Sequence, residues 1–142
     1  MPWAADQDFD RTANFMRVVT QKRDRGEALE GAIVLDGRIA GCAGFPVIDP
    51  VARAAMMGYW VAAEHQGRGL VTRAAKALIE HAFADLGLHR VEIRAATENV
   101  RSRAIPERLG FTQEGVLREA ELVNGRYQDL AVYGLLASDR SA

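Results

Sequence analysis

The sequence predicts a single domain, residues 1–142, built on a mixed α/β (α+β) sheet, and three observations support this prediction. The pairs Asp-Gly at 36–37 and Asn-Gly at 124–125 each separate two apolar runs, which is the strongest short-range signal of a β-hairpin. An amphipathic segment with helical spacing, residues 71–86, lies between two short strands and predicts a crossover helix. A length of 142 residues is typical of one domain with one core.

The first part of the chain predicts one helix followed by three strands. Asp6 or Asp8 is a suitable cap for a helix that runs to about Arg25, and Gly26 is a natural end for it. The next expected elements are strands over 31–35, 38–45 and 56–61, with loops over 46–50 and 62–69.

The segment from Val71 to Leu86 is the clearest helix. Its apolar residues recur at the i, i+3, i+4 and i+7 spacing over four turns, and Gly87 ends it. The remaining expected elements are a strand over 90–95, a short helix over 99–109 that Gly110 ends, and hairpin strands over 116–123 and 126–136.

The composition excludes several classes of partner. With 18 Lys and Arg against 19 Asp and Glu, the chain has no basic excess with which to hold nucleic acid or an anionic membrane. No apolar run approaches the roughly 20 residues of a membrane span, and the N-terminus has no signal-peptide pattern. A lone cysteine, Cys42, forms no internal disulfide, and the histidine spacing makes no metal site. We therefore expect a cytoplasmic protein without a metal.

The segment between the third strand and the long helix, residues 60–71, is a candidate binding loop. Gly67 and Gly69 allow the backbone to approach a ligand closely and to adopt positive φ. The free N–H groups at the start of the next helix favour an anion, and Arg68 adds a positive charge. A dinucleotide fingerprint needs a third glycine where Thr72 stands, and the Lys of a Walker loop is absent. Two interpretations of the loop remain: a binding site for a pyrophosphate of another kind, and a purely structural turn.

Three motifs make the chain resemble a known family. The loop Gln66-Gly-Arg-Gly69-Leu-Val71 resembles the acetyl-CoA loop of the Gcn5-related N-acetyltransferases (GNAT), although Val71 stands where the family usually has a small residue. Two further motifs follow in the family's order: Asn99-Val-Arg-Ser102 with Leu109-Gly-Phe111, and Glu119-Ala-Glu121 with residues 124–129. Together they resemble the branch that acetylates the N-termini of ribosomal proteins, the RimJ/RimL-like branch, over nearly the whole chain.

The resemblance implies both a fold and a co-substrate. The fold is a mostly antiparallel sheet with a splayed strand pair and flanking helices, and the co-substrate is acetyl-CoA. The residues that match the family's acetyl-CoA site are Trp60, Val61, Ala62, Gln66, Gly67, Arg68, Gly69, Leu70, Val71, Thr72, Asn99 and Ser102. For Asn99, a helix cap is an equally good interpretation.

Two residues match catalytic positions of that branch. Many family members place a Tyr seven residues after the Asn as general acid, but this chain has Pro106 there. The acid proposed for the branch corresponds to Ser102, and the proposed base corresponds to Glu121. Glu119 lies two residues away on a predicted strand and would share the face of Glu121. Because Pro106 has no N–H, the carbonyl of residue 102 should lack its helical hydrogen bond and stay open to water or ligand.

The functional hypothesis is transfer of acetyl from acetyl-CoA to a primary amine, with a protein N-terminal α-amine as the expected acceptor. At pH 7, deprotonation costs roughly 1.0–1.4 kcal/mol for an α-amine and about 4.6 kcal/mol for a Lys side chain, given their ordinary pKa values. A single carboxylate base therefore suits the α-amine better. Two alternatives stay open: a small-molecule amine acetyltransferase, and a non-catalytic regulator that binds acetyl-CoA.

The resemblance also implies that the chain lacks the family's first strand and helix, because Met1-Pro-Trp3 resembles a stretch that follows that strand. Residues 32–35 would then form a sheet edge that is short, apolar and without Lys or Pro, and such an edge invites another strand. We therefore expect a homodimer with two-fold symmetry. The alternative is that Met1 is an internal methionine of a longer natural chain.

Overall fold

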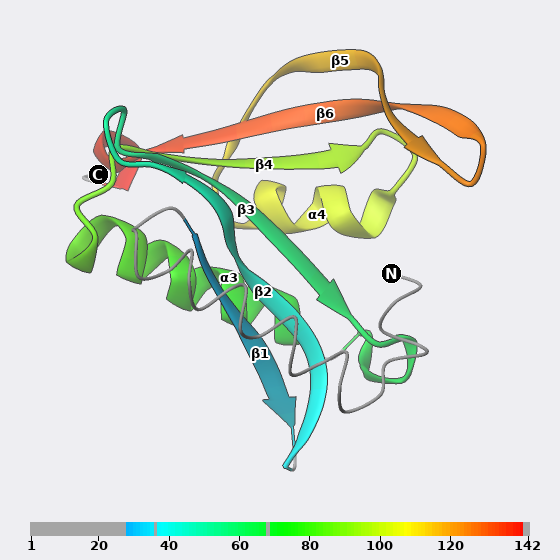
Figure 1. Cartoon of the computed structure of the whole chain (residues 1–142), viewed down its shortest axis with the longest axis horizontal. Helices are drawn as coiled ribbons and strands as arrows, with labels where there is room; N and C mark the ends of the chain where they lie inside the picture. Colours follow the sequence, from blue (N-terminus) through cyan, green and yellow to red (C-terminus); the bar gives the residue numbers. More distant parts are fainter. Residues whose placement is uncertain (1–27, 36, 68, 141–142) are drawn as a thin grey trace.

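The computed structural model describes residues 28–35, 37–67 and 69–140. The first expected helix and Arg68 of the candidate loop lie outside these residues. The described chain forms a six-stranded sheet with the order β1-β2-β3-β4-β6-β5, shown in Figure 1. The strands are β1 (Leu29–Leu35), β2 (Arg38–Asp49), β3 (Ala54–Val61), β4 (Arg90–Ala96), β5 (Thr112–Val123) and β6 (Arg126–Leu136). The predicted mixed α/β sheet is confirmed.

The sheet is antiparallel except at its centre, where β3 and β4 are parallel. This pairing needs a crossover connection, which the helix α3 (Leu70–Glu80) and the π-helical turn η2 (His81–Asp85) supply. Gly87 then ends the helical segment with a φ of 63°, as predicted. The other elements are the helix α4 (Val100–Arg108) and the short 3-10 turns η1 (Ala63–His65) and η3 (Ala137–Arg140).

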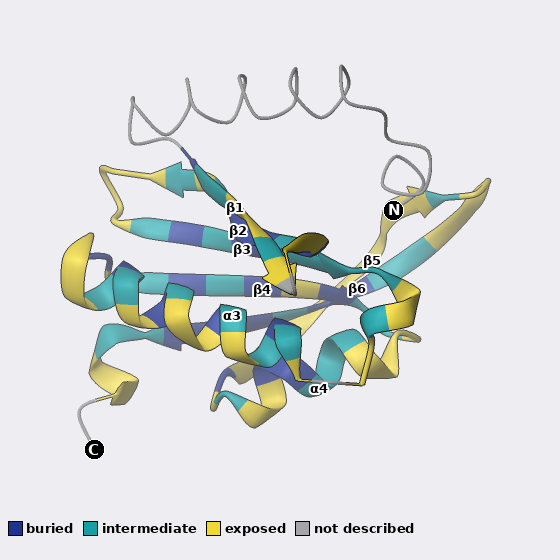
Figure 2. Ribbon diagram, turned by 90° about the horizontal axis from the view of Figure 1, so that it is seen from below, coloured by how far each residue is buried: buried dark blue, intermediate teal, exposed yellow. Residues whose placement is uncertain are grey.

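Both α3 and α4 cover the same face of the sheet, as Figure 2 shows. The stripe of α3 that was predicted to be apolar buries Val71, Ala75 and Ile79, and Ala82 continues it in η2. Leu86 differs from the prediction, since it lies beyond the last helical turn and is exposed. The sheet residues that face this stripe in the core include Val91, Ile93, Ala131, Tyr133 and Leu135. Burial of these apolar side chains is the main force that holds the helices on the sheet.

The parallel strands β3 and β4 separate before either one ends. Their paired register covers residues 54–57 of β3 and 90–93 of β4, whereas β3 continues to Val61 and β4 to Ala96. The two strands diverge visibly in Figure 1. Residues 58–61 of β3 therefore form no ladder with β4, and the splayed pair implied by the family resemblance is present.

Residues 46–49 differ from the predicted loop, because they extend β2 as far as Asp49. A proline inside a strand cannot donate a ladder hydrogen bond, and this argued for a loop. The structure accommodates Pro46 with a bulge between Gly44 and Val47 in the pairing with β3. The chain turns only afterwards, at residues 50–53.

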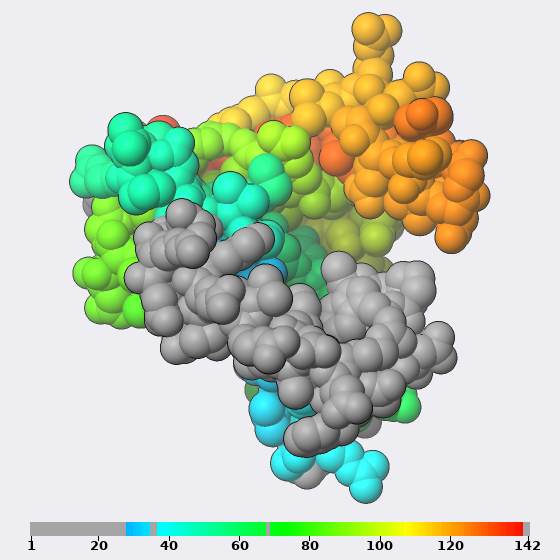
Figure 3. Space-filling model, viewed as in Figure 1, coloured from blue at the N-terminus to red at the C-terminus, as the bar shows by residue number. Residues whose placement is uncertain are grey.

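Strand β5 also departs from a regular hairpin. The turn at residues 124–125 forms as predicted, with positive φ at both positions. Between Leu117 and Glu121, however, the register shifts, and Glu119 adopts a φ of 49°. The bulge therefore interrupts the simple alternation on which the expected shared face of Glu119 and Glu121 was based. The β5–β6 hairpin, orange in Figure 3, forms one end of the molecule.

The outermost described strands are β1 and β5. The prediction that residues 32–35 lie at a sheet edge thus holds for the described part of the chain. Val34 of β1 is 61% exposed. Within the described ranges, no helix has both the length and the apolar character that a membrane crossing requires.

Candidate functional site

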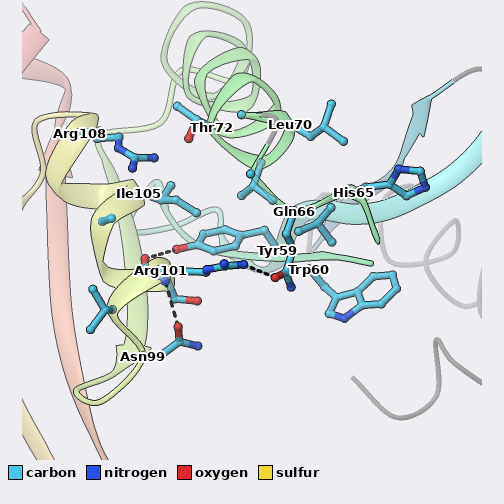
Figure 4. A pocket seen from close by; sticks show the side chains of 17 residues that line it. Tyr59, Trp60, His65, Gln66, Leu70, Thr72, Asn99, Arg101, Ile105 and Arg108 are labelled. Atoms are coloured by element: carbon cyan, nitrogen blue, oxygen red, sulfur yellow. Dashed lines mark hydrogen bonds between the residues drawn. The ribbon is translucent and has the colours of Figure 1, made fainter. Parts of the chain in front are cut away.

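A cleft of about 720 Å³ opens where β3 and β4 separate, a size suited to a small-molecule ligand. It is lined by the end of β3, the following loop, the first turn of α3 and one side of α4 (Figure 4). Ala62, which was predicted to bind the cofactor, does not line it and donates its N–H to the Ala40 carbonyl at 2.7 Å. The predicted residues that do line it are Trp60, Val61, Gln66, Gly67, Gly69, Leu70, Val71, Thr72, Asn99 and Ser102.

The two glycines of the loop both have left-handed backbone conformations, with φ of 80° at Gly67 and 71° at Gly69. Most residues with a Cβ rarely adopt such angles, so glycine is favoured at both positions by the path of the chain. A Cβ added at either position would meet no heavy atom within 4 Å. The space beside this backbone is therefore open to a ligand.

The start of α3 presents amide groups that the helix does not use. Gly69 is the N-cap and has no side chain to cap the helix, and the N–H of Arg73 donates to its carbonyl at 3.0 Å. The N–H groups of Leu70, Val71 and Thr72 precede this first helical bond and so have no acceptor within the helix. Together with the positive end of the helix dipole, they favour an anion.

Two arginines of α4 line the same cleft. Arg101 and Arg108 lie seven residues apart, which places both on one side of the helix. Nη1 of Arg101 donates to the side-chain oxygen of Gln66 and so links α4 to the loop. No Asp or Glu is among the described residues that line the cleft. Its charge therefore suits a ligand that carries phosphates.

The first turn of α4 places Ser102 in the cleft. The Asn99 side chain caps the helix by accepting the N–H of Ser102 at 3.1 Å. The Ser102 carbonyl, which Pro106 leaves without a helical donor, accepts a hydrogen bond from the Tyr59 hydroxyl at 2.8 Å. The carbonyl is free of a helical donor, as predicted, but the expectation that it stays open to water or ligand is wrong, because Tyr59 of β3 bonds to it.

Tyr59 remains a hydrogen-bond donor at any ordinary pH. Burial, with a smaller contribution from Tyr133, raises the pKa of the Tyr59 hydroxyl well above its usual value. The hydroxyl therefore keeps its proton and stays neutral beside the Ser102 carbonyl.

The predicted base lies apart from the cleft lining. Glu121 is exposed on β5, where it pairs with Gln128. Gln128 and the core residue Ala131 lie three apart on β6, so their side chains point to opposite faces. Glu121 thus belongs to the sheet face that α3 and α4 do not cover. Glu119 is also exposed, and its N–H donates to the Asp129 carboxylate at 2.7 Å, which stabilises the bulge.

Sequence reasoning missed four polar residues of the cleft: Tyr59, His65, Arg101 and Arg108. Signals for three of them were present, since Tyr59 alternates with Val61 on β3, and the two arginines share one side of a predicted helix. Among the described residues, no three His, Cys, Asp or Glu side chains gather as a metal site would require.

The chain is similar to known acetyltransferases. The family described as Acetyltransferase (GNAT) domain matches residues 1–112. The putative ribosomal N-acetyltransferase YdaF of Bacillus subtilis (strain 168) is 44% identical over 108 residues, which cover 76% of this chain and 59% of that protein. The spermidine N(1)-acetyltransferase of Vibrio cholerae is 34% identical over 91 residues, which cover 64% of this chain and 53% of that protein. The chain therefore spans less than two thirds of the length of these two relatives.

Solved structures share the fold. RimL, a ribosomal L7/L12 alpha-N-protein acetyltransferase in complex with coenzyme A, aligns with a TM-score of 0.85 at 30% identity, over 92% of this chain and 73% of that chain. The Microcin C7 self-immunity acetyltransferase MccE, in complex with acetyl-CoA and AMP, aligns with a TM-score of 0.84 at 32% identity, over 94% of this chain and 75% of that chain.

Proposed function

The chain belongs to the acetyltransferase (GNAT) domain family, and from this premise we propose that it transfers the acetyl group of acetyl-CoA to a primary amine. The observation that carries the proposal is the cleft at the splayed ends of β3 and β4. It combines open glycine backbone and unused helix amides with the Ser102 side chain. The acetyltransferase relatives and solved structures support the same activity.

Acetyl-CoA fits the groups that line the cleft. Its pyrophosphate is anionic, and the amides of residues 70–72 offer donors beside glycines that leave the space open. Its pantetheine arm contains amide groups, which can bond the main chain of β3 beyond Met57, on the side from which β4 has diverged. When bound, acetyl-CoA supplies a thioester carbonyl as the acetyl donor.

Acetyl transfer requires two proton movements. The amine must lose a proton to attack the carbonyl carbon, and the sulfur must gain one as the carbon–sulfur bond breaks. We assign the second proton to the hydroxyl of Ser102, a residue that lines the cleft, and the removal of the first to the Glu121 carboxylate. Because Glu121 belongs to the face that α3 and α4 do not cover, the acceptor would approach from that face.

The acceptor that we propose is a protein N-terminal α-amine. The names of RimL and YdaF, which refer to ribosomal substrates, support this acceptor class. An α-amine also needs only roughly 1.0–1.4 kcal/mol to lose its proton at pH 7. A polyamine is the second candidate, because the spermidine N(1)-acetyltransferase of Vibrio cholerae is 34% identical over the aligned residues.

An acceptor screen tests the proposal. The chain is incubated with acetyl-CoA and, in separate reactions, a peptide with a free N-terminus, the same peptide with a blocked N-terminus and an internal Lys, and spermidine. We expect thiol release and one added acetyl group only on the free α-amine. Acetylation of spermidine alone would favour the second candidate. Binding of acetyl-CoA without thiol release from any acceptor would overturn the proposal in favour of a non-catalytic regulator.

A further inference from the structure

One helical hydrogen bond is absent from the first turn of α4. In a regular helix the Ser102 carbonyl would accept the N–H of the residue four positions later, but that residue is Pro106. The helix begins regularly, since the N–H of Arg103 donates to the Asn99 carbonyl at 3.0 Å. The gap therefore falls on the carbonyl of Ser102, a residue that lines the cleft.

The Tyr59 hydroxyl occupies this gap from another part of the fold. It donates to the Ser102 carbonyl at 2.8 Å across 43 positions of sequence, and a dashed line marks the bond in Figure 4. Both residues are half-buried and line the cleft. Because an unpaired carbonyl away from water costs free energy, this bond favours one position of the turn.

Tyr59 lies at the point where the sheet opens. It is two residues beyond Met57, the last residue of β3 that pairs with β4. The helix α4 follows β4 in the chain, so the bond joins the two sides of the opening. Other contacts hold α4 to β6: the Arg103 side chain donates to the Tyr133 hydroxyl at 3.0 Å. Among the described hydrogen bonds of Ser102, the bond from Tyr59 is the one that reaches β3.

The hydroxyl of Tyr59 is poorly placed to act as an acid. Its hydrogen is directed to a carbonyl, which only accepts, and burial raises the pKa of this hydroxyl. A phenol with a raised pKa that is committed to the main chain serves better as a fixed support than as a proton donor.

We propose that Tyr59 is a positioning residue for acetyl transfer, which holds the first turn of α4, and with it the Ser102 hydroxyl, in place through the bond to the Ser102 carbonyl. This inference rests on the proposed function, because the role of Tyr59 acts through Ser102.

A double-mutant cycle of Tyr59→Phe and Pro106→Ala tests the inference. Phe keeps the ring in the cleft and removes only the hydroxyl, whereas Pro106→Ala restores an N–H that can donate to the Ser102 carbonyl. We expect Tyr59→Phe alone to lower kcat about 3- to 10-fold, the size of one net hydrogen bond, with acetyl-CoA affinity changed less than about twofold. In the Pro106→Ala background the same change should lower kcat less than about twofold, because the carbonyl keeps a donor.

The free energy of unfolding is measured for the same four proteins, since it needs no acceptor. Coupling between the two substitutions in this quantity is expected if the hydroxyl fills the gap that Pro106 leaves. Tyr127→Phe is the matched control for removal of a hydroxyl, because Tyr127 is 59% exposed on β6 and does not line the cleft. Its unfolding free energy and acetyl-CoA affinity should not change.

The outcomes are distinct. A loss in kcat of about 10²-fold or more that persists in the Pro106→Ala background would identify Tyr59 as a proton donor and overturn the positioning role. An unchanged kcat for Tyr59→Phe would overturn it as well. If the unchanged chain releases no thiol with any acceptor, the proposed function fails instead. The coupling in unfolding free energy then still shows whether the bond exists, so the two failures can be told apart.

Discussion

The side-chain oxygen of Asn99 accepts the N–H of Ser102 at 3.1 Å, so a residue that lines the cleft also caps α4. Sequence reasoning left a helix cap and a cofactor contact as two interpretations of Asn99, and the structure confirms the cap. The cap uses the oxygen of the Asn99 side-chain amide. The NH₂ group of the same amide is left to donate a hydrogen bond to an oxygen of acetyl-CoA. The cofactor contact therefore stays a prediction.

Asn99→Ser and Asn99→Ala separate the two roles. Ser is itself a good N-cap, so we expect only Ala to lower the free energy of unfolding, by about 1 kcal/mol. If the amide also binds the cofactor, acetyl-CoA affinity should fall about 3- to 10-fold in both variants, because neither retains the NH₂ group. Denaturant unfolding and calorimetry provide the two readouts. Unchanged affinity in Asn99→Ser would restrict Asn99 to the cap.

Gly69→Asp and Gly69→Asn test the anion site at the start of α3. Both side chains would extend into open space from a backbone with a φ of 71°, a conformation that Asn and Asp tolerate better than most residues. They have nearly the same shape, and only Asp adds a negative charge. At separations near 6 Å, like charges repel by roughly 1–3 kcal/mol, so we expect acetyl-CoA to bind the Gly69→Asp variant about tenfold or more weakly than the Gly69→Asn variant.

The difference between these two variants should shrink as salt is added, because ions screen the repulsion. Calorimetric titrations at low and high ionic strength measure it. If the two variants bind acetyl-CoA equally well at low salt, the pyrophosphate does not lie beside residue 69.

Ser102→Ala and Glu121→Gln test the proposed acid and base. Each should lower kcat by about 10²-fold or more, the range of acid–base groups, while acetyl-CoA affinity changes little. Glu119→Gln is the matched control, because it removes a neighbouring exposed carboxylate on the bulge of β5. A large loss of kcat in Glu119→Gln, with normal turnover in Glu121→Gln, would identify Glu119 as the base in place of Glu121. Normal turnover in Ser102→Ala would show that another group is the general acid.

Local patterns predicted most of the elements, because hairpin turns and helix stripes depend on neighbours in sequence. The turn at residues 124–125 and the buried stripe of α3 formed as expected. The bulges at Pro46 and Glu119 were not predicted, since a bulge is defined by the register of the partner strand. The loop residues of the candidate site followed from a motif, whereas the bond from Tyr59 to Ser102 joins positions 43 apart and depends on the tertiary fold.

A network of ion pairs ties β4 to β5 on the sheet face opposite the helices. Nη2 of Arg90 lies 2.8 Å from Glu92 and 2.8 Å from Glu114, and Nε of Arg94 lies 2.7 Å from Glu92. Burial alone raises the pKa of Glu92, but the hydrogen bonds from Arg90 and Arg94 outweigh it and lower the pKa. The hydrogen bond from Arg90 lowers the pKa of Glu114 in the same way.

Glu92→Gln should weaken the dependence of stability on acid pH. A carboxylate whose pKa is lower in the folded state contributes stability above its unfolded pKa, about 4.3 for Glu, and loses it as the pH falls through the folded pKa. We therefore expect the unfolding free energy to drop less steeply in the variant below about pH 4.3. Urea unfolding from pH 7 downward checks this, with the exposed Glu64→Gln as control. If the unfolding free energy of Glu92→Gln falls with pH as steeply as that of the unchanged chain, the prediction is contradicted.

The outer edge of β1 provides the last prediction. Among the described strands none pairs with that edge, and Val34 on it is 61% exposed. An unpaired edge offers main-chain N–H and C=O groups to a second strand, and a two-fold dimer would satisfy both copies at once. We propose that the chain dimerises in this way and expect light scattering at micromolar concentration to give twice the mass of the chain.

Val34→Lys should shift the dimer to monomer, because a charged side chain on an edge strand opposes pairing. Val51→Lys is the matched control, since Val51 is 94% exposed in the turn after β2 and lies away from this edge. The dimer should persist in that variant. A well-folded monomer of the unchanged chain, with fast amide exchange along residues 32–35, would rule the dimer out, because a paired edge protects its amides.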